Sequence, residues 1–577
     1  MILGAPVIAI PIFVRFGLYQ SVVRYIGYKS LWSIGQAVIL YGILWGLIGF
    51  MAAVEGIPRS VILINCILSL FVVGGSRMLA RWLLTVDKGS SNTQKSNVII
   101  YGAGSAGRQL STALQFSAEY NHVAFVDDNP AKQGSTINNI PVESGNELSA
   151  LIESQEVSEV LLALPSVSRK HRNEIIEILR PLPVYVRSLP SVSELAQGKV
   201  KIEDLREVSI KDLLGRELAE PNNELLKTKI TDKAVMVTGA GGSIGSELCR
   251  QILFLKPKQL ILFEINEFSL YQIEQELNNI GMPYVEIIPI LGSVRDRGRV
   301  EKVCGYFGVQ TIYHAAAYKH VPLVEFNNSE GVLNNIIGTK IVAEAAIAAK
   351  VETFVFISTD KAVRPTNTMG TTKRVAELVL QALAEMDHNT CFTMVRFGNV
   401  LGSSGSVIPL FKKQIKEGGP ITVTHEDIVR YFMTIPEAVE LVIQAGAMCD
   451  GGDVFVLDMG EPVRIYDLAV RMIQLSGLQV CDEANPGGDI EIKITGLRPG
   501  EKLYEELLVG DNTSETENPL IMRAKESMLH WDKLSGLINK LESASVNSEH
   551  ERVRELLLEV VPEFTPQCAI EDLLYDQ

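Results

Sequence analysis

The sequence predicts an α/β protein in which N-terminal transmembrane helices precede two Rossmann-like domains, each built on a doubly wound parallel sheet. Three features of the 577-residue chain lead to this prediction. An uncharged apolar run lies near the start, and two glycine-rich turns farther on each follow an apolar strand and begin a helix. Strands and helices then alternate, which is typical of a parallel sheet covered on both faces.

Residues 1–90 are predicted to form a transmembrane region. Leu31–Val54 has no charged residue over 24 positions, enough for a helix to cross about 30 Å of hydrocarbon. Ser60–Ser76 adds 17 uncharged residues, the lower limit for a span. A buried core helix is the alternative, but no polar face interrupts the first run. Basic residues flank the two runs, so the positive-inside rule predicts a multi-pass protein of the cell inner (plasma) membrane with its later domains in the cytoplasm.

Charge and cysteine content narrow the classes of partner. The formal net charge is −15, which makes nucleic acid an unfavourable partner. The lipid bilayer is an expected partner because of the predicted transmembrane helices. The seven cysteines are scattered and form no CxxC pair. This pattern favours reduced thiols over a disulfide framework, and no metal site is expected.

The first Rossmann-like domain is predicted over residues 91–195. An apolar strand runs into Gly102-x-Gly104-x-x-Gly107, and Asp127 follows twenty residues later at the end of the next strand. This spacing is compatible with a bound nucleotide. Because no catalytic group follows in the same domain, a Rossmann-shaped scaffold without a ligand is an equal alternative. Residues 196–230 are predicted to be a connector.

The second domain, residues 231–530, carries the stronger glycine-rich signal. Thr238 and Gly239 begin a strand–turn–helix segment that continues through Gly242 and Gly245. Such glycines let backbone N–H groups approach a pyrophosphate at a helix N-terminus. Nineteen residues later, Glu264 closes the next strand, where its carboxylate suits a ribose 2′-hydroxyl and would repel a 2′-phosphate. The sequence therefore favours NAD over NADP. A charged helical tail is predicted over 531–577.

The segment Phe356–Lys373 is the most informative stretch of this domain. Its apolar strand is followed by Thr359, Asp360 and Lys361, at the sheet edge where open α/β folds place their chemistry. An adjacent carboxyl and amine can act as general acid and general base for an elimination. Met369 and Lys373 then occupy a Met-x-x-x-Lys pattern, where a short-chain dehydrogenase has Tyr-x-x-x-Lys.

Several motifs together resemble one enzyme family. They are TGAGGSIGSE, HAAAYKHVPLVE, ISTDKAVRPTNTMGTTKR, RFGNVLGSSGSVIP, RYFMTIPEA and RPGEKLYEELL. They resemble the membrane-bound nucleotide-sugar 4,6-dehydratases of polysaccharide and glycan biosynthesis, such as UDP-N-acetylglucosamine 4,6-dehydratases. The resemblance covers essentially the whole chain. It implies an extended short-chain dehydrogenase fold for the second domain, a lyase activity on a UDP-sugar, and a fold that commonly associates into homo-oligomers.

The resemblance also implies a mechanism. NAD⁺ would take hydride from C4 of the sugar, Lys361 would remove the C5 proton, Asp360 would release the C6 hydroxyl as water, and NADH would return hydride at C6. The product would be a 4-keto-6-deoxy sugar nucleotide. Methionine cannot accept a proton, so the C4 hydroxyl needs another base than Met369. Lys373 or its bound water ranks first, ahead of Thr359 with a water and a substrate group, and Met369 can simply line the pocket.

The remaining site residues follow from the same motifs. Lys319 and Asn399 match positions near the sugar, while Arg430 and Arg498 suit the UDP phosphates, which arginine can bind bidentately. The expected cofactor-binding residues are Gly239, Gly242, Ser243, Ile244, Gly245, Glu264, Ala315, Ala316 and Lys373. Two alternatives remain: a UDP-sugar 4-epimerase, which needs no acid–base pair for water loss, and a catalytically inactive nucleotide-sugar sensor, suggested by Met369.

Overall fold

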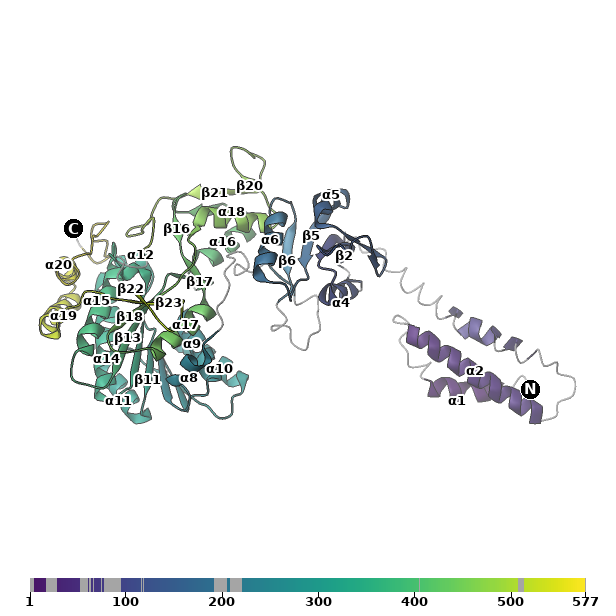
Figure 1. Cartoon of the computed structure of the whole chain (residues 1–577), viewed down its shortest axis with the longest axis horizontal. Helices are drawn as coiled ribbons and strands as arrows, with labels where there is room; N and C mark the ends of the chain where they lie inside the picture. The colour runs from purple at the N-terminus through teal and green to yellow at the C-terminus, as the bar shows by residue number, and fades with distance from the viewer. Residues whose placement is uncertain are drawn as a thin grey trace. The chain divides into compact units, whose positions relative to one another are not determined.

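The computed structural model in Figure 1 describes most of the chain. The described residues are 5–16, 28–51, 61, 64–65, 67–73, 75–76, 95–115, 117, 119–190, 205–207, 221–403, 405–506 and 513–575. Contacts between residues divide the chain into two compact units, Met1–Lys95 and Ser96–Gln577. The finer domain boundaries given above stay predictions.

The first unit contains a pair of packed helices, α1 (Ala5–Arg15) and α2 (Tyr28–Met51). Ile12 of α1 is buried against α2, whose Val38 and Trp45 face it in one apolar cluster. The Asn65 amide of the following segment donates to the Tyr41 hydroxyl at 2.9 Å. Apolar side chains of this unit therefore serve, in part, to pack one helix on another.

The predicted transmembrane helices are not supported. Among the described residues, no helix combines the length and the apolar character that crossing a bilayer requires. The prediction of N-terminal transmembrane helices is therefore wrong, and so is the multi-pass location in the inner membrane derived from it. The prediction rested on the absence of charge over Leu31–Val54 and Ser60–Ser76, whereas one face of α2 is used for packing on α1. Residues 52–54 and part of 60–76 lie outside the described residues.

The first sheet of the second unit has seven strands in the order β3-β4-β2-β1-β5-β6-β7. The strands are β1 (Ser96–Tyr101), β2 (Tyr120–Val126), β3 (Thr136–Ile137), β4 (Ile140–Glu143), β5 (Val157–Leu162), β6 (Tyr185–Ser188) and β7 (Arg206–Glu207). The helices are α4 (Ser105–Leu114), α5 (Leu148–Ser154) and α6 (Arg169–Leu179). The central pairs β1–β2, β1–β5 and β5–β6 are parallel, as the alternation predicts.

The second sheet has nine strands in the order β10-β9-β8-β11-β12-β13-β18-β23-β22. The strands are β8 (Ala234–Thr238), β9 (Gln259–Glu264), β10 (Glu286–Leu291), β11 (Thr311–His314), β12 (Thr353–Ile357), β13 (Cys391–Arg396), β18 (Asp453–Leu457), β22 (Thr513–Glu515) and β23 (Ile521–Ala524). All pairs from β10 to β18 are parallel, and β23 adds an antiparallel edge. The carboxyl ends of these parallel strands therefore lie along one edge of the sheet, where the site is expected.

Helices cover both faces of this sheet, as Figure 1 shows. On one face pack α11 (Arg297–Phe307), α14 (Gly338–Ala348), α15 (Thr368–Ala384), α19 (Trp531–Val546) and α20 (His550–Val560). On the other pack α8 (Asn223–Thr228), α9 (Ser243–Phe254), α10 (Glu267–Ile280) and α17 (Ile435–Ala447). Successive strand residues alternate between the two cores, with Phe354 and Phe356 on one face and Val355 on the other. The predicted doubly wound α/β architecture is confirmed for this region.

A smaller set of elements lies beyond the carboxyl edge of the large sheet. It comprises β14 (Asn399–Leu401), α16 (Val407–Lys416), β15 (Ile421–Val423), β16 (Val429–Arg430), β17 (Phe432–Thr434), β19 (Val463–Arg464), α18 (Ile465–Leu475), β20 (Val480–Cys481) and β21 (Ile490–Ile494). These elements share a separate core around Phe411 and Ile473. Between them and the large sheet lies a cavity of about 920 Å³.

One disulfide contradicts the prediction of reduced, scattered thiols. Cys391 and Cys449 are bonded, with their Cα atoms 6.3 Å apart. Cys391 begins β13, and Cys449 lies just before β18, which is the parallel neighbour of β13. The two cysteines are separated by 58 positions, so their proximity depends on strand pairing and cannot be seen in the sequence spacing.

Candidate functional site

The glycine-rich turn joins β8 to α9 and forms one wall of the cavity. Gly239 has a φ of +66°, and a Cβ added there would lie 2.8 Å from the Ala316 backbone nitrogen. A Cβ on Gly245 would lie 1.9 Å from the Gly239 carbonyl oxygen. Both positions therefore require glycine on steric grounds, and the tight turn exposes the first turn of α9, including Ser243 and Ile244, to the cavity.

Glu264 lies beside this turn. It ends β9, is 7% exposed, and accepts a hydrogen bond from the Gly241 backbone N–H at 3.0 Å. Its other oxygen accepts from the backbone N–H groups of Ile265 and Asn266, each at 2.9 Å. Glu264 is not among the residues that line the cavity, but a carboxylate fixed beside the glycine-rich turn is the arrangement that suits the ribose of a dinucleotide. The chain's own residues thus fit the predicted NAD.

The segment after β11 forms the next part of the wall. Ala315 lines the cavity and donates its N–H to the Thr238 carbonyl at 3.1 Å, and Ala316 lies against Gly239. The Tyr318 N–H donates to the Asn335 side-chain oxygen at 2.8 Å, which fixes the backbone leading to Lys319. Lys319 also lines the cavity, and burial lowers its pKa. Sequence reasoning missed Asn335 because its contact with Tyr318, 17 positions away, depends on how the two segments fold together.

The segment that follows β12 brings Thr359, Asp360 and Lys361 to the carboxyl edge of the sheet. Backbone hydrogen bonds continue beyond the strand, from Ser358 N–H to the Val395 carbonyl at 2.8 Å and from Asp360 N–H to the Phe397 carbonyl at 3.1 Å. Asp360–Ala362 then form a single 3-10 turn, capped by the Thr359 hydroxyl. This anchoring fixes the acid and the amine in place.

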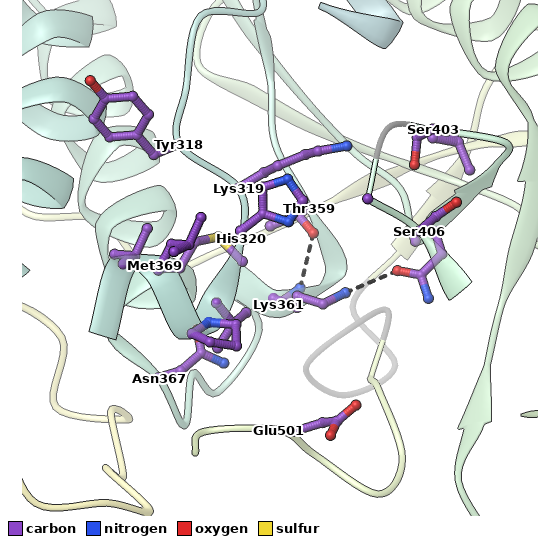
Figure 2. Close-up of a pocket in the computed structure, with 18 of the residues that line it drawn as sticks. Tyr318, Lys319, His320, Thr359, Lys361, Asn367, Met369, Ser403, Ser406 and Glu501 are labelled. Carbon is purple, nitrogen blue, oxygen red and sulfur yellow. Dashed lines mark hydrogen bonds between the residues drawn. The ribbon is translucent and has the colours of Figure 1, made fainter. Parts of the chain in front are cut away.

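Lys361 is the central charged group of the cavity. Its Nζ lies 3.0 Å from Asp360 Oδ1 and 3.3 Å from Asn399 Oδ1, and Figure 2 shows its side chain extending away from Met369 and Asn367. Burial lowers the pKa of Lys361, but the neighbouring acidic groups, above all the Asp360 carboxylate, outweigh this effect and hold the pKa above its ordinary value. The resting lysine is therefore an ammonium.

Asp360 is buried behind this lysine. It is 1% exposed and is not among the residues that line the cavity, although its neighbours Thr359 and Lys361 are. The Thr359 hydroxyl donates to Asp360 Oδ1 at 2.8 Å. Any proton exchanged between Asp360 and a ligand in the cavity would therefore pass through Thr359 or Lys361.

Met369 and Lys373 lie on the first turns of α15 and both line the cavity. The Lys373 ammonium group donates to the Ile357 carbonyl at 2.9 Å and lies 4.5 Å from the centre of the Phe356 ring. Burial in these apolar surroundings lowers the pKa of Lys373 to about 7. Lys373 can therefore exist as a neutral amine near neutral pH and accept a proton. Met369 has no group that can accept a proton.

The two arginines expected near phosphate occupy different surroundings. Arg498 lines the cavity at its rim, as expected. Arg430 also lines it, but it is 7% exposed and donates to the carbonyls of Lys502 and Leu503 at 2.8 and 3.2 Å. Much of the Arg430 guanidinium is therefore already used to hold the chain segment that carries Glu505.

A buried ion network lies next to the segment Thr359–Lys361, which is called the catalytic segment below for the role predicted from the sequence. Glu377 of α15 accepts hydrogen bonds from the Ser358 hydroxyl at 2.6 Å and from Arg396 Nε at 2.7 Å. Arg374 and Glu526 complete the network. Burial alone would raise the pKa of Glu377, but Arg396 and Arg374 outweigh it and hold the pKa below its ordinary value. The network ties the end of β12 to α15 and β13.

Replacing Glu377 by glutamine should destabilise the fold by about 3–5 kcal/mol, because it leaves two buried guanidinium groups with Glu526 as the one carboxylate of the network. Urea unfolding of the native chain and the variant measures this change. Glu555→Gln is the matched control: it removes a carboxylate from an exposed Arg552–Glu555 pair at 2.7 Å and should change stability little. Equal losses of unfolding free energy in Glu377→Gln and Glu555→Gln would show that the buried network adds no stability.

Comparison with known proteins identifies the family. Residues 235–526 match the model of a family described as "Polysaccharide biosynthesis protein", and residues 15–190 match one described as "CoA-binding domain". The capsular polysaccharide biosynthesis protein CapD of Staphylococcus aureus is 42% identical over 497 residues, which cover 85% of this chain and 82% of CapD. The chain belongs to the polysaccharide biosynthesis protein family.

Other known proteins resemble this chain over different lengths. The probable polysaccharide biosynthesis protein EpsC of Bacillus subtilis is 43% identical over 83% of this chain and 81% of its own. A UDP-glucose 4-epimerase of Rickettsia rickettsii is 34% identical over 50% of this chain and 81% of its own. The solved structure of Pen from Bacillus thuringiensis is 35% identical, covers 54% of this chain and 98% of its own, and superposes with a TM-score of 0.46.

Proposed function

We propose that the chain is an NAD-dependent UDP-N-acetylhexosamine 4,6-dehydratase that makes a 4-keto-6-deoxy sugar nucleotide for polysaccharide biosynthesis. The observation that carries this proposal is the Asp360–Lys361 pair, 3.0 Å apart at the carboxyl edge of the sheet. Its Lys361 lines the same cavity as the glycine-rich turn. An acid and a base held together on one side of a sugar suit removal of water across a carbon–carbon bond.

The chain's residues can be assigned roles in such a reaction. The turn from Gly239 to Gly245, together with Glu264, would hold NAD, which when bound supplies hydride acceptance at C4 and hydride return at C6. Lys373, with its pKa of about 7, accepts the proton of the C4 hydroxyl. Lys361 removes the C5 proton, which a C4 ketone makes acidic. Asp360 releases the C6 hydroxyl as water, and the Thr359 hydroxyl links Asp360 to the cavity.

The sugar nucleotide itself would be bound by further groups that line the cavity. Lys319 and Asn399 line the cavity and would bind the sugar, and Arg498 suits the diphosphate. Arg430 would act mainly on the protein, since it holds the backbone of residues 502–503.

A UDP-sugar 4-epimerase is the second candidate, since the Rickettsia relative carries that name. The two functions share the C4 chemistry but differ at C5 and C6. An epimerase needs no acid and base for loss of water, so the buried Asp360–Lys361 pair favours the dehydratase.

Incubation of the full chain with NAD and UDP-N-acetylglucosamine, followed by mass spectrometry and NMR of the nucleotide sugar, separates the candidates. The dehydratase gives a product one water lighter with a C6 methyl group. The epimerase gives an isomer of unchanged mass. Unchanged substrate that nevertheless binds would indicate the inactive sensor and contradict the proposal.

A further inference from the structure

Glu505 is a buried carboxyl group that faces the cavity and that the proposed mechanism does not use. Its side chain is 3% exposed, it lines the cavity, and its Oε1 lies 3.7 Å from Lys361 Nζ. Its Oε2 is buried and accepts no hydrogen bond from the described residues. A buried carboxylate without a donor is costly, whereas a protonated carboxyl group can exist there and retains an O–H to donate.

Two of the cations around Glu505 already have other carboxylate partners. The charged groups that face it are Lys361 and Asp360 from the catalytic segment, Arg430 from β16, and Lys502 from its own segment. Arg430 pairs with Glu501 at 3.4 Å. Glu506 pairs with both Arg364 at 3.5 Å and Lys502 at 3.7 Å.

Lys361 is therefore the cation that lies between two carboxyl groups. Asp360 is the better placed anion of the two, since it accepts from both Lys361 and the Thr359 hydroxyl. Glu505 lies farther from the amine, and 3.9 Å separates its Oε1 from Arg430 Nε. A site with one cation and two buried carboxyl groups is best balanced when Glu505 holds a proton.

We propose that Glu505 is held protonated near neutral pH, and that its neutral state allows Lys361 to pass its proton to Asp360. In that transfer an N–H bond of the Lys361 ammonium breaks and an O–H bond forms on Asp360, while Glu505 keeps its proton. The transfer produces the neutral amine and the carboxylic acid from which elimination starts. Glu505 is thus a positioning residue for charge, and its role rests on the proposed dehydratase function.

The pH dependence follows from this arrangement. Burial raises the pKa of Glu505, and the Asp360 carboxylate adds to that effect against the opposing cations Lys361, Arg430 and Lys502. When the pH rises through the pKa of Glu505, its new negative charge stabilises the Lys361 ammonium. Lys361 then gives up its proton less readily, and the rate of elimination should fall on the alkaline side.

The test is the pH profile of kcat for the full chain and for Glu505→Gln, with UDP-N-acetylglucosamine as substrate. Glutamine has the shape of the protonated carboxyl group and no charge. We expect the variant to keep its rate near pH 7 within about threefold and to lose the alkaline fall. Glu555→Gln, which removes a carboxylate from the exposed Arg552–Glu555 pair, is the control and should keep the native profile.

A second measurement does not depend on catalysis. A carboxyl group with a raised pKa in the folded state contributes stability below its unfolded pKa and loses that contribution as the pH rises through the folded pKa. The melting temperature of the native chain should therefore fall relative to that of Glu505→Gln over the same range of pH. If the glutamine variant does not fold, Glu505→Met, which is also uncharged and unbranched, provides the same comparison.

Two results would overturn the inference. One is a Glu505→Gln variant that is slowed about 100-fold at every pH, because this would show that the charged carboxylate is required. The other is a variant with the native alkaline fall and the native pH dependence of melting. A native chain that does not dehydrate the sugar would instead contradict the proposed function, and the melting comparison would still report on the protonation of Glu505.

Discussion

Lys361→Ala is expected to lower the rate of water elimination by about 10²–10⁴-fold, the range that a positioned general base contributes. Lys361 is the amine that reaches the cavity from the catalytic segment, and Asp360 and Asn399 fix its Nζ at 3.0 and 3.3 Å. Alanine leaves no group there that could remove the C5 proton. Stopped assays of product formation under saturating substrate measure the loss directly as kcat.

The control for this variant separates catalysis from binding and folding. Lys302→Ala removes an exposed lysine from α11 and should leave kcat unchanged. Calorimetric titration should show that Lys361→Ala still binds the nucleotide sugar. Normal dehydration by Lys361→Ala would contradict the assignment of the base.

Gly370→Ala is expected to cost about 100-fold in rate through a single added methyl group, because displacement of a catalytic group by about 1 Å has an effect of that size. A Cβ on Gly370 would lie 2.1 Å from the Lys361 carbonyl oxygen. That distance forces α15 and the 3-10 turn apart, and the turn carries both Asp360 and Lys361. Steady-state kinetics of the purified variant measure the loss.

A second helical glycine provides the matched control for Gly370. Gly305 lies within α11, and a Cβ there meets no heavy atom within 4 Å. Gly305→Ala should therefore leave kcat unchanged and stabilise the helix by about 0.5–1 kcal/mol. Activity of Gly370→Ala equal to that of Gly305→Ala would show that the catalytic turn does not depend on this contact.

The parts of the fold that depend on local pattern could be predicted from the sequence. The glycine-rich turn after β8 is encoded within a few residues, and the structure shows why Gly239 and Gly245 cannot carry a side chain. The position of Asp360 and Lys361 at the end of a buried strand is equally local. These features follow from strand periodicity and turn sterics, which need no knowledge of distant segments.

Features made by distant segments could not be predicted in this way. Glu505 reaches Lys361 because contacts from distant segments, among them those of Arg430 with residues 502–503, hold its backbone beside the cavity. The Cys391–Cys449 bond depends on the pairing of β13 with β18. The absence of charge over Leu31–Val54 was likewise an incomplete guide, because it does not reveal how much of an apolar helix is used for packing on α1.

The central claim is that the chain removes water across C5 and C6 of a UDP-N-acetylhexosamine. The most direct measurement is the reaction of the full chain with UDP-N-acetylglucosamine in D₂O, followed by NMR of the sugar. We predict a C6 methyl group together with deuterium at C5, because Lys361 exchanges its protons with solvent before one is returned to C5. A sugar that keeps its C6 hydroxyl and its C5 proton, as epimer or as unchanged substrate, would contradict the claim.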